Sequence, residues 1–315
     1  MSSLSFQTVS IAIAQIFVLC SVGFFLVRRK IVDDSGLKLL SWLSVNISFP
    51  FYIFYQIIHN FNPSTQSHWW AYPLINLSLC LTGVLIASGA ALLFKKKESH
   101  EWAAIGGFHN AGYIPLLLVT MLPLADKTQE LYSYVILTII GFDLCLWSLG
   151  AWLLSDRKKA KVSLKSFINP PILSMMAAFI LVLLGAKNIF PETVLKPIRV
   201  MGDSALAIAM LTIGGNLALT HFKKIQWKNI TGAVLIKLFI LPVLALIFLR
   251  VTHMGGMWAF ILMVQSCMPT SITLSIIARH NDNPHQNLIN QTIFVTHVLC
   301  ALTIPLFLGL YGGGY

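Results

Sequence analysis

The chain has 315 residues, of which 57% are hydrophobic and only 10% are charged, and its mean hydropathy is +0.77. Soluble globular domains carry about 25% charged residues, so this composition excludes an ordinary soluble fold. The net charge of +11 does not indicate nucleic-acid binding, because the basic residues form short clusters between apolar segments. We therefore predict an all-α polytopic protein that lies in a lipid bilayer.

Ten apolar segments follow one another along the chain, and roughly 20 apolar residues are enough to span a bilayer as a helix. The segments are 7–27, 37–58, 69–94, 102–123, 131–154, 171–186, 198–220, 230–249, 257–278 and 288–310. The sixth is short and begins at the Asn169-Pro170-Pro171 sequence. Proline suits the first turn of a helix, so these prolines are expected to mark its start.

Cysteine usage and the N-terminus add two expectations. All five cysteines lie inside apolar segments without any C-x-x-C spacing, which is typical of small buried side chains and not of a metal site or a disulfide framework. We expect neither a bound metal nor a cofactor. No basic residue precedes the first apolar run, so that run is expected to be a span and not a cleaved signal peptide.

Lys and Arg are distributed unequally between the two sides of the membrane. Sixteen of them follow odd-numbered segments, five follow even-numbered ones, and Lys237 lies within a segment. Basic residues favour cytoplasmic loops, so both termini are predicted to be non-cytoplasmic.

The chain divides into two halves of five segments each. We expect a first repeat over residues 1–154, a basic cytoplasmic linker over 155–170 and a second repeat over 171–315. Because each half has an odd number of spans, the halves would lie in opposite orientations, as in many secondary transporters.

Polar and helix-breaking residues interrupt the fourth segment of each half, at 110–115 and 265–271. Proline lacks an N–H and disturbs the preceding turn, and unpaired backbone is tolerated in lipid only inside protein or beside water. Two ordinary proline kinks would be the simpler explanation for such a pattern. Matched interruptions in two halves nevertheless favour a binding site near the middle of the membrane.

Several stretches, in this order, resemble the auxin efflux carrier family of secondary transporters, which includes bacterial carriers for malonate- and malate-like acids. They are GFFLVRRKIVDDSGLKLLSWLSVNISFPFYIF, FHNAGYIPLLL, INPPILSMMAAFILVLLGAKNIFP, LTIGGNLAL, KLFILPVLALIF and MPTSITLSIIARHND. The resemblance covers nearly the whole chain. It departs at Leu116 and Leu117, where many family members carry a second proline.

The resemblance implies ten transmembrane helices in two inverted five-helix repeats, whose broken fourth and ninth helices cross near the bilayer midplane and bind an anion. The substrate-binding residues expected at this crossing are Asn110, Gly112, Tyr113, Pro115, Pro269 and Thr270. Asn216 is a further candidate because Gly214 and Gly215 before it would let a helix or a ligand approach the backbone.

Ionisable residues within apolar segments are functional candidates because they are costly in lipid. Asp143 is the deepest acid, and a neutral structural carboxyl and a proton carrier fit its position equally well. His109 adjoins the first interruption and is either an interior histidine or an ion-coupling one. Lys237 is expected to extend its ammonium to the interface. His297 and Asp203 are expected to be structural.

The sequence thus predicts a secondary active transporter that moves a small organic anion, a carboxylate, across the plasma membrane (the inner membrane of a bacterium) by alternating access. H⁺ or Na⁺ coupling and a homodimer remain open. The alternatives are a transporter-like sensor, a channel or an intramembrane enzyme. H-E-x-x-H is absent from the sequence, Asp143 has no obvious acidic partner, and the segments leave no room for a signalling domain.

The orientation can be tested by cysteine labelling in a variant that lacks the native cysteines. A cysteine at Ser163, in the linker, should resist an impermeant reagent added to intact cells and react after the membrane is opened. Labelling from outside in sealed cells would contradict the predicted topology.

Overall fold

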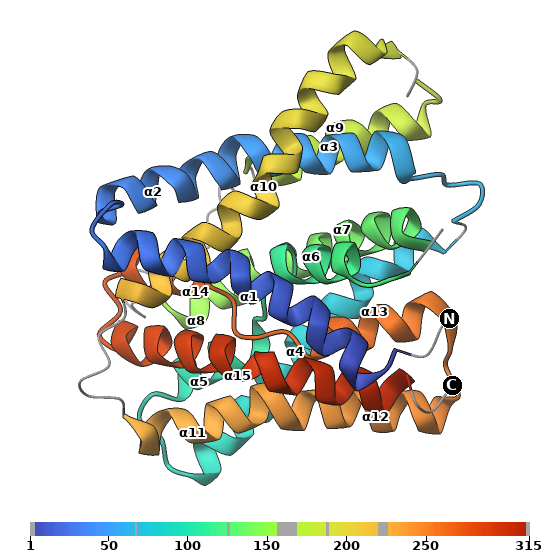
Figure 1. Ribbon diagram of the computed structural model, residues 1–315. Helices are drawn as coiled ribbons and strands as arrows, with labels where there is room; N and C mark the ends of the chain where they lie inside the picture. Colours follow the sequence, from blue (N-terminus) through green and yellow to red (C-terminus); the bar gives the residue numbers. More distant parts are fainter. Residues whose placement is uncertain are drawn as a thin grey trace.

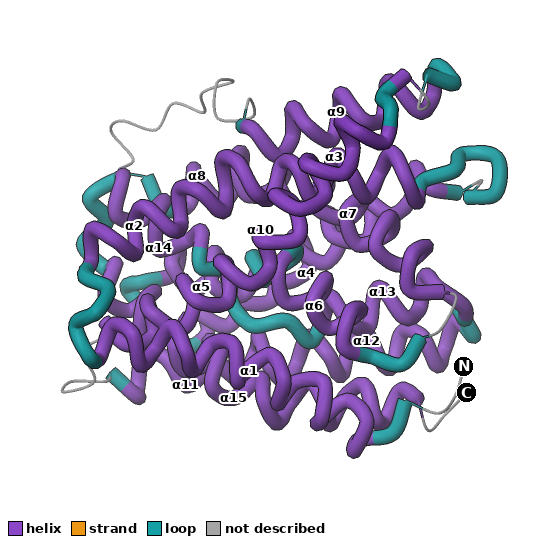
Figure 2. Tube along the Cα trace, turned by 45° about the horizontal axis from the view of Figure 1, so that its top comes forward, coloured by secondary structure: helices purple, strands orange, loops and turns teal. Residues whose placement is uncertain are grey.

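The computed structural model describes residues 4–66, 68–124, 127–155, 169–186, 189–219 and 226–312. Within these ranges every regular element is a helix (Figures 1 and 2). Seven helical runs are long and apolar enough to cross a membrane. They confirm the prediction of an all-helical membrane protein.

The seven runs coincide with seven of the predicted segments. They are α1 (Phe6–Arg28), α2–η1–α3 (Asp34–Leu43, Ser44–Ser48, Phe49–Asn60), η2–α4 (Trp69–Ala71, Tyr72–Leu93), α7–η4–α8 (Thr128–Cys145, Leu146–Gly150, Ala151–Leu153), α10 (Glu192–Leu219), α11–η8–α12 (Trp227–Leu235, Ile236–Ile240, Leu241–Thr252) and α15 (Gln286–Gly312).

The remaining predicted segments are helical in a different way. The sixth is the shorter α9 (Pro170–Leu183), which the Asn169 side chain caps by accepting from the N–H of Ile172. The fourth and ninth are interrupted, as α5 (Ser99–Gly107) with α6 (Tyr113–Met121) and α13 (Gly256–Ser266) with α14 (Thr273–His280). Whether the chain crosses the membrane ten times stays a prediction.

Two of the long runs contain a π-helical turn just before a proline. Turn η1 precedes Pro50 and turn η8 precedes Pro242. A proline removes one backbone donor and clashes with the carbonyl four residues earlier, and a wider turn relieves both problems. Turn η8 therefore changes the direction of the side chains around Lys237.

The helices form two groups. Helices α2, α3 and α9 make the upper layer in Figure 1, and α10 joins them as it runs diagonally from the top of the molecule down to α1, while α4 to α8 and α11 to α15 form the second group below. Helix α1 packs on α10 of the first group and on α15 of the second. The ends of the chain lie at the same end of the molecule (Figure 1). This arrangement leaves a boundary between two helical groups.

The contact between α1 and α10 depends on glycine. A Cβ on Gly214 would overlap the carbonyl of Cys20, and one on Gly23 would overlap the backbone of Leu211. The glycine pair of α10 thus permits a close approach, as the sequence predicts, and the neighbour is helix α1.

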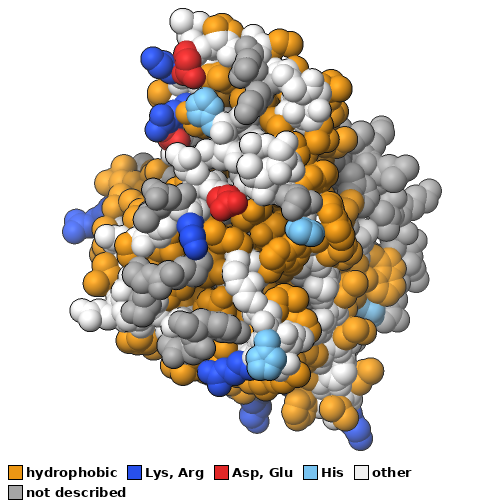
Figure 3. All heavy atoms as spheres, turned by 90° about the vertical axis from the view of Figure 1, so that its right-hand side faces the viewer, with side chains coloured by type: hydrophobic (Ala, Val, Ile, Leu, Met, Phe, Trp, Pro, Cys, Tyr) orange, Lys and Arg blue, Asp and Glu red, His pale blue; other side chains and the backbone are white. Residues whose placement is uncertain are grey.

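The outer faces of the helices are apolar. Large side chains such as Phe25, Leu85 and Val251 are more than half exposed, at 61%, 71% and 72%. Figure 3 shows the end of the molecule that carries the termini, where charged side chains are few and lie scattered among hydrophobic ones. Such surfaces are stable in contact with lipid and would aggregate in water.

Replacing Gly214 with leucine should separate α1 from α10 and destabilise the protein by about 1–3 kcal/mol or more, because the new side chain meets backbone. Gly89→Leu on α4 is the matched control, since a Cβ there has no atom within 4 Å. Thermal unfolding of the purified variants in detergent measures both effects. Equal unfolding temperatures for the two variants would contradict the packing described.

Candidate functional site: the crossing of two interrupted helices

The first interruption separates α5 from α6. Helix α5 ends at Gly107, and Gly112 is the N-cap of α6. Pro115 lies in the first turn of α6, and the break occupies the turn before it, where a proline ring would clash with the carbonyl four residues earlier. A first-turn residue needs no N–H, and proline there helps α6 to start.

The second interruption runs from Cys267 to Ile272, between α13 and α14. Pro269 lies within it, as predicted. The Pro269 carbonyl accepts a hydrogen bond from the first interruption. The N–H of Thr270 donates to the Thr296 hydroxyl of α15 over 3.3 Å.

The two interruptions pair with each other. The N–H of Asn110 donates to the carbonyl of Pro269 over 2.8 Å, and the N–H of Ser271 donates to the carbonyl of Phe108 over 3.0 Å. These bonds make an isolated antiparallel bridge between His109 and Thr270. Each broken helix thus satisfies backbone groups of the other, which lipid could not do.

The bridge separates the predicted site residues into two faces. His109 and Thr270 lie opposite each other and are fully buried, and Nε2 of His109 lies 3.3 Å from Oδ1 of Asn76 on α4. Successive residues of an extended strand point to opposite sides, so Asn110 faces away from this pair. Asn110 is 7% exposed, and Gly112 and Tyr113 are partly exposed.

Gln265, on the last turn of α13, holds the crossing in place. Its Nε2 donates to the carbonyl of Ala111 over 3.1 Å and to the Thr138 hydroxyl of α7 over 3.0 Å. Gln265 lies within the predicted second interruption, 265–271, but is not among the predicted site residues. The sequence signal for its role is an amide side chain within an otherwise apolar segment.

The N-terminal end of α6 lies at the crossing. The first N–H groups of a helix have no partner within it and carry partial positive charge. The ring centroids of Tyr113 and Phe49 lie 4.6 Å apart, and the Tyr113 hydroxyl lies 3.4 Å from the hydroxyl of Ser44. At α14 the Ser271 hydroxyl accepts the N–H of Thr273 over 3.3 Å, so α6 has the more available end.

Asp143 lies on α7, one turn beyond Ile139, whose side chain approaches Gly112. Its carboxyl is partly buried and interacts electrostatically with Tyr113. Among the described residues, no Lys, Arg or His forms an ion pair with it. Asp143 and the α6 end of the crossing are therefore neighbours.

Lys237 does not reach the membrane interface, so the prediction for it is wrong. Its side chain is fully buried, and Nζ donates to the carbonyl of Gly106 over 3.3 Å. Gly106 belongs to the last turn of α5, where carbonyls lack helical partners. Turn η8 thus packs against the end of the broken helix α5.

A cavity of about 440 Å³ lies on the boundary between the two helical groups. It is lined by Leu19, Tyr52, Tyr55, Gln56, His59, Asn60, Leu117, Thr120, Gln129, Tyr132, Arg199, Asp203, Leu206 and Ala207. In its wall Nε of Arg199 lies 3.5 Å from Oδ2 of Asp203, and the guanidinium lies 5.6 Å from the Tyr55 ring. Asp203, predicted to be structural, thus takes part in an ion pair in the wall of this cavity.

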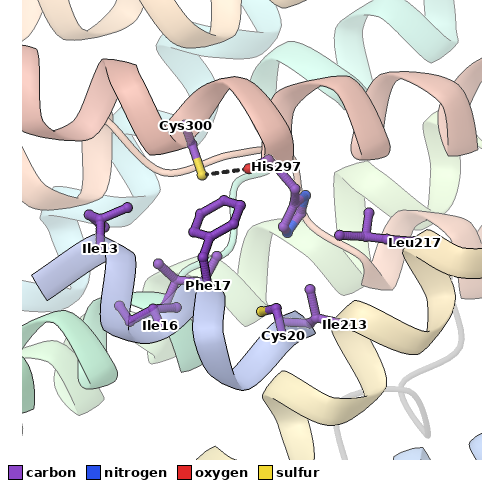
Figure 4. Close-up of a pocket in the computed structure, with 9 residues that line it drawn as sticks. Ile13, Ile16, Phe17, Cys20, Ile213, Leu217, His297 and Cys300 are labelled. Carbon is purple, nitrogen blue, oxygen red and sulfur yellow. Dashed lines mark hydrogen bonds between the residues drawn. The ribbon is translucent and has the colours of Figure 1, made fainter. Parts of the chain in front are cut away.

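A smaller cavity, of about 20 Å³, lies beside the start of α6 (Figure 4). Its lining is apolar except for His297 of α15, whose Nδ1 lies 2.8 Å from the carbonyl of Ile293. It has room for about one water molecule and none for an organic anion.

The predicted candidate Asn216 is not in the lining of this cavity, although its neighbour Leu217 is. Asn216 is exposed and donates to the Thr212 carbonyl of its own helix over 2.8 Å.

The apolar helices and the paired interruptions define a polytopic membrane protein of the kind that carries small solutes. The chain matches the family described as membrane transport protein over residues 8–163 and 157–308. It belongs to this family, that of the auxin efflux carriers. The two matched stretches meet at the predicted linker, whose residues 156–168 lie outside the described ranges. No curated protein matches the chain.

Gln265→Met should destabilise the protein by about 1–2 kcal/mol. Two interhelical hydrogen bonds of about 0.6 kcal/mol each are lost, and the buried Ala111 carbonyl is left without this donor. Pro115→Ala should change stability by less than about 1 kcal/mol, since the break forms without it. Thermal unfolding in detergent compares the two. A larger loss for Pro115→Ala would show that the proline does open the helix.

Proposed function

We propose that this membrane transport protein is a secondary active transporter that moves a small organic anion, a carboxylate, by alternating access. In this proposal the chain forms ten spans in two inverted repeats, and the substrate binds at the crossing. The family supports transport, and the paired interruptions support the position of the site.

The observation that carries the proposal is the crossing itself. Two half-helices begin there, and each helix N-terminus carries roughly half a positive charge from its aligned peptide dipoles. Backbone N–H groups at such ends bind carboxylates without a basic side chain. Asn110 adds a directional donor, because its side-chain amide is free of hydrogen bonds to the described residues.

The cavity on the boundary supplies a route to this site. Leu117 and Thr120 in its wall belong to α6, the half-helix that begins at the crossing. Tyr52 is also in the wall, and its ring centroid lies 6.4 Å from that of Phe49. The Phe49 ring in turn packs on that of Tyr113. Arg199 near the start of α10 also lies in the cavity wall, where the Asp203 carboxylate offsets its charge.

The boundary also supplies a way to move. One wall of the cavity comes from α1, α3 and α10 and the other from α6 and α7. If the two groups shift against each other, the cavity closes on this side while the crossing travels with the second group. Motion of one bundle against another is the usual basis of alternating access.

The proposal distinguishes a carrier from a channel or a sensor. Protein reconstituted into vesicles preloaded with carboxylate should take up labelled carboxylate against its gradient, because a carrier exchanges substrate. A channel would only dissipate the gradient, and a sensor would bind without transport. Either of these results would contradict the proposal.

The substrate can be found by thermal-shift screening against mono- and dicarboxylates at several pH values. A ligand at 100 times its Kd stabilises the protein by about 2.7 kcal/mol. With the best ligand, Asn110→Ala should weaken binding about 10- to 150-fold, the effect of losing one hydrogen bond to a charged group, of about 1.5–3 kcal/mol. Thr270→Ala, on the opposite and buried face of the bridge, is the comparison and should change binding less. Unchanged affinity in Asn110→Ala would place the site elsewhere.

Asp143 and His109 are the proposed ion-coupling residues. Asp143→Asn keeps the shape of the side chain and removes its titration. The variant should bind carboxylate but lose the dependence of uptake on a pH gradient. His109→Gln provides the comparison at the buried face of the crossing. Wild-type uptake and pH dependence in Asp143→Asn would show that the carboxyl is structural.

A further inference from the structure

Lys237 has an unusual environment for a lysine in a membrane protein. Its side chain is completely buried between helices, and the ammonium donates to the carbonyl of Gly106. A charge buried without compensation costs several kcal/mol, so lysines within spans are rare and tend to be functional.

The partners of Lys237 are dipoles and not carboxylates. Among the described residues, no Asp or Glu lies within 4.0 Å of its ammonium. It interacts electrostatically with Cys80 of α4 and with His109 in the first interruption. The nearest negative feature is therefore the carbonyl end of α5, which has a partial negative charge of roughly half a unit.

The position of this end matters for an anion site. The crossing brings together two helix N-termini, which attract an anion, and two C-termini, which repel it. In transporters with broken helices, the exposed carbonyls and C-terminal ends coordinate the coupling Na⁺ or H⁺. At α5 the equivalent carbonyl is already occupied by a side-chain ammonium.

We propose that the C-terminal end of α5 is a monovalent-cation site whose occupant is the chain's own Lys237. The tethered ammonium neutralises the repulsive end of α5, so the crossing needs no Na⁺ at this position to hold an anion. The idea extends the proposed transport function to its ion requirement, but its structural part stands without any substrate.

Removing the lysine side chain should expose the vacant site. In Lys237→Ala the volume of three methylenes and an ammonium opens beside the Gly106 carbonyl, and we expect a Na⁺ or K⁺ that keeps one or two of its waters to enter there. The close packing of α5 on α4 keeps this carbonyl in place, because a Cβ on Gly106 would overlap that of Ala87. The variant should therefore acquire a response to small cations that the wild type lacks.

The test is thermal unfolding of purified protein in NaCl, KCl or choline chloride at equal ionic strength, without carboxylate. Wild type should unfold at the same temperature in all three salts. Lys237→Ala should unfold at a lower temperature in choline and gain at least about 2 °C in NaCl or KCl, with saturation. Lys237→Arg, which retains the charge, should resemble wild type in its indifference to the salt.

Two further variants complete the design. Lys96→Ala is the matched control, because Nζ of Lys96 also donates to a carbonyl, that of Lys228 over 2.8 Å, but at the surface. It should show no specific response to cations. If Lys237→Ala does not fold, Lys237→Ser, which also vacates the Gly106 carbonyl and removes the charge, is measured in the same way.

The proposal is overturned if the foldable neutral variant unfolds at one temperature in all three salts. It is also overturned if wild type itself is saturably stabilised by Na⁺ over choline, because the site would then not be filled by lysine. Neither result depends on carboxylate binding, so a failure of the proposed transport function would remain distinguishable.

Discussion

The structure depends on one constraint: backbone polar groups within a membrane must find partners inside the protein. Each broken helix alone would leave backbone N–H and carbonyl groups without partners. The two breaks pair with each other through the hydrogen bonds from Asn110 to Pro269 and from Ser271 to Phe108. The remaining polar groups of the interruptions are bound by neighbours, chiefly Gln265 and Thr296. The crossing is consequently a fixed object, and a ligand that binds there meets helix ends whose positions are already determined.

Electrostatics follows from this arrangement. Four half-helices end near one another, and their dipoles would largely cancel at the crossing if all ends were equally exposed. They are not equivalent. The carbonyl end of α5 meets the Lys237 ammonium and the start of α14 is capped by Ser271, while the start of α6 is partly exposed beside Asn110. The exposed end is therefore a positive one, which is the basis on which we propose an anion site without an arginine at that depth.

Much of the fold could be predicted from the sequence because membrane helices are defined by local composition. Segment positions and the two interruptions depend on apolar length and on glycine, proline and asparagine within it. The errors concern features that local sequence does not determine. The start of the first break at Phe108 is one such feature, because pairing with the second half supplies an alternative to helix there. Lys237 was judged by its distance along its own helix, whereas its burial depends on α5 packing beside turn η8. The role of Gln265 likewise appears only when α7 and α13 meet.

The most direct test of the account is an experimentally determined structure with a bromine-labelled carboxylate chosen from the thermal-shift screen. The account predicts an anomalous bromine signal at the crossing, with the carboxylate oxygens within hydrogen-bonding distance of the Asn110 amide and the first N–H groups of α6. A labelled carboxylate that stabilises the protein but lies elsewhere, with the crossing unoccupied, would contradict it.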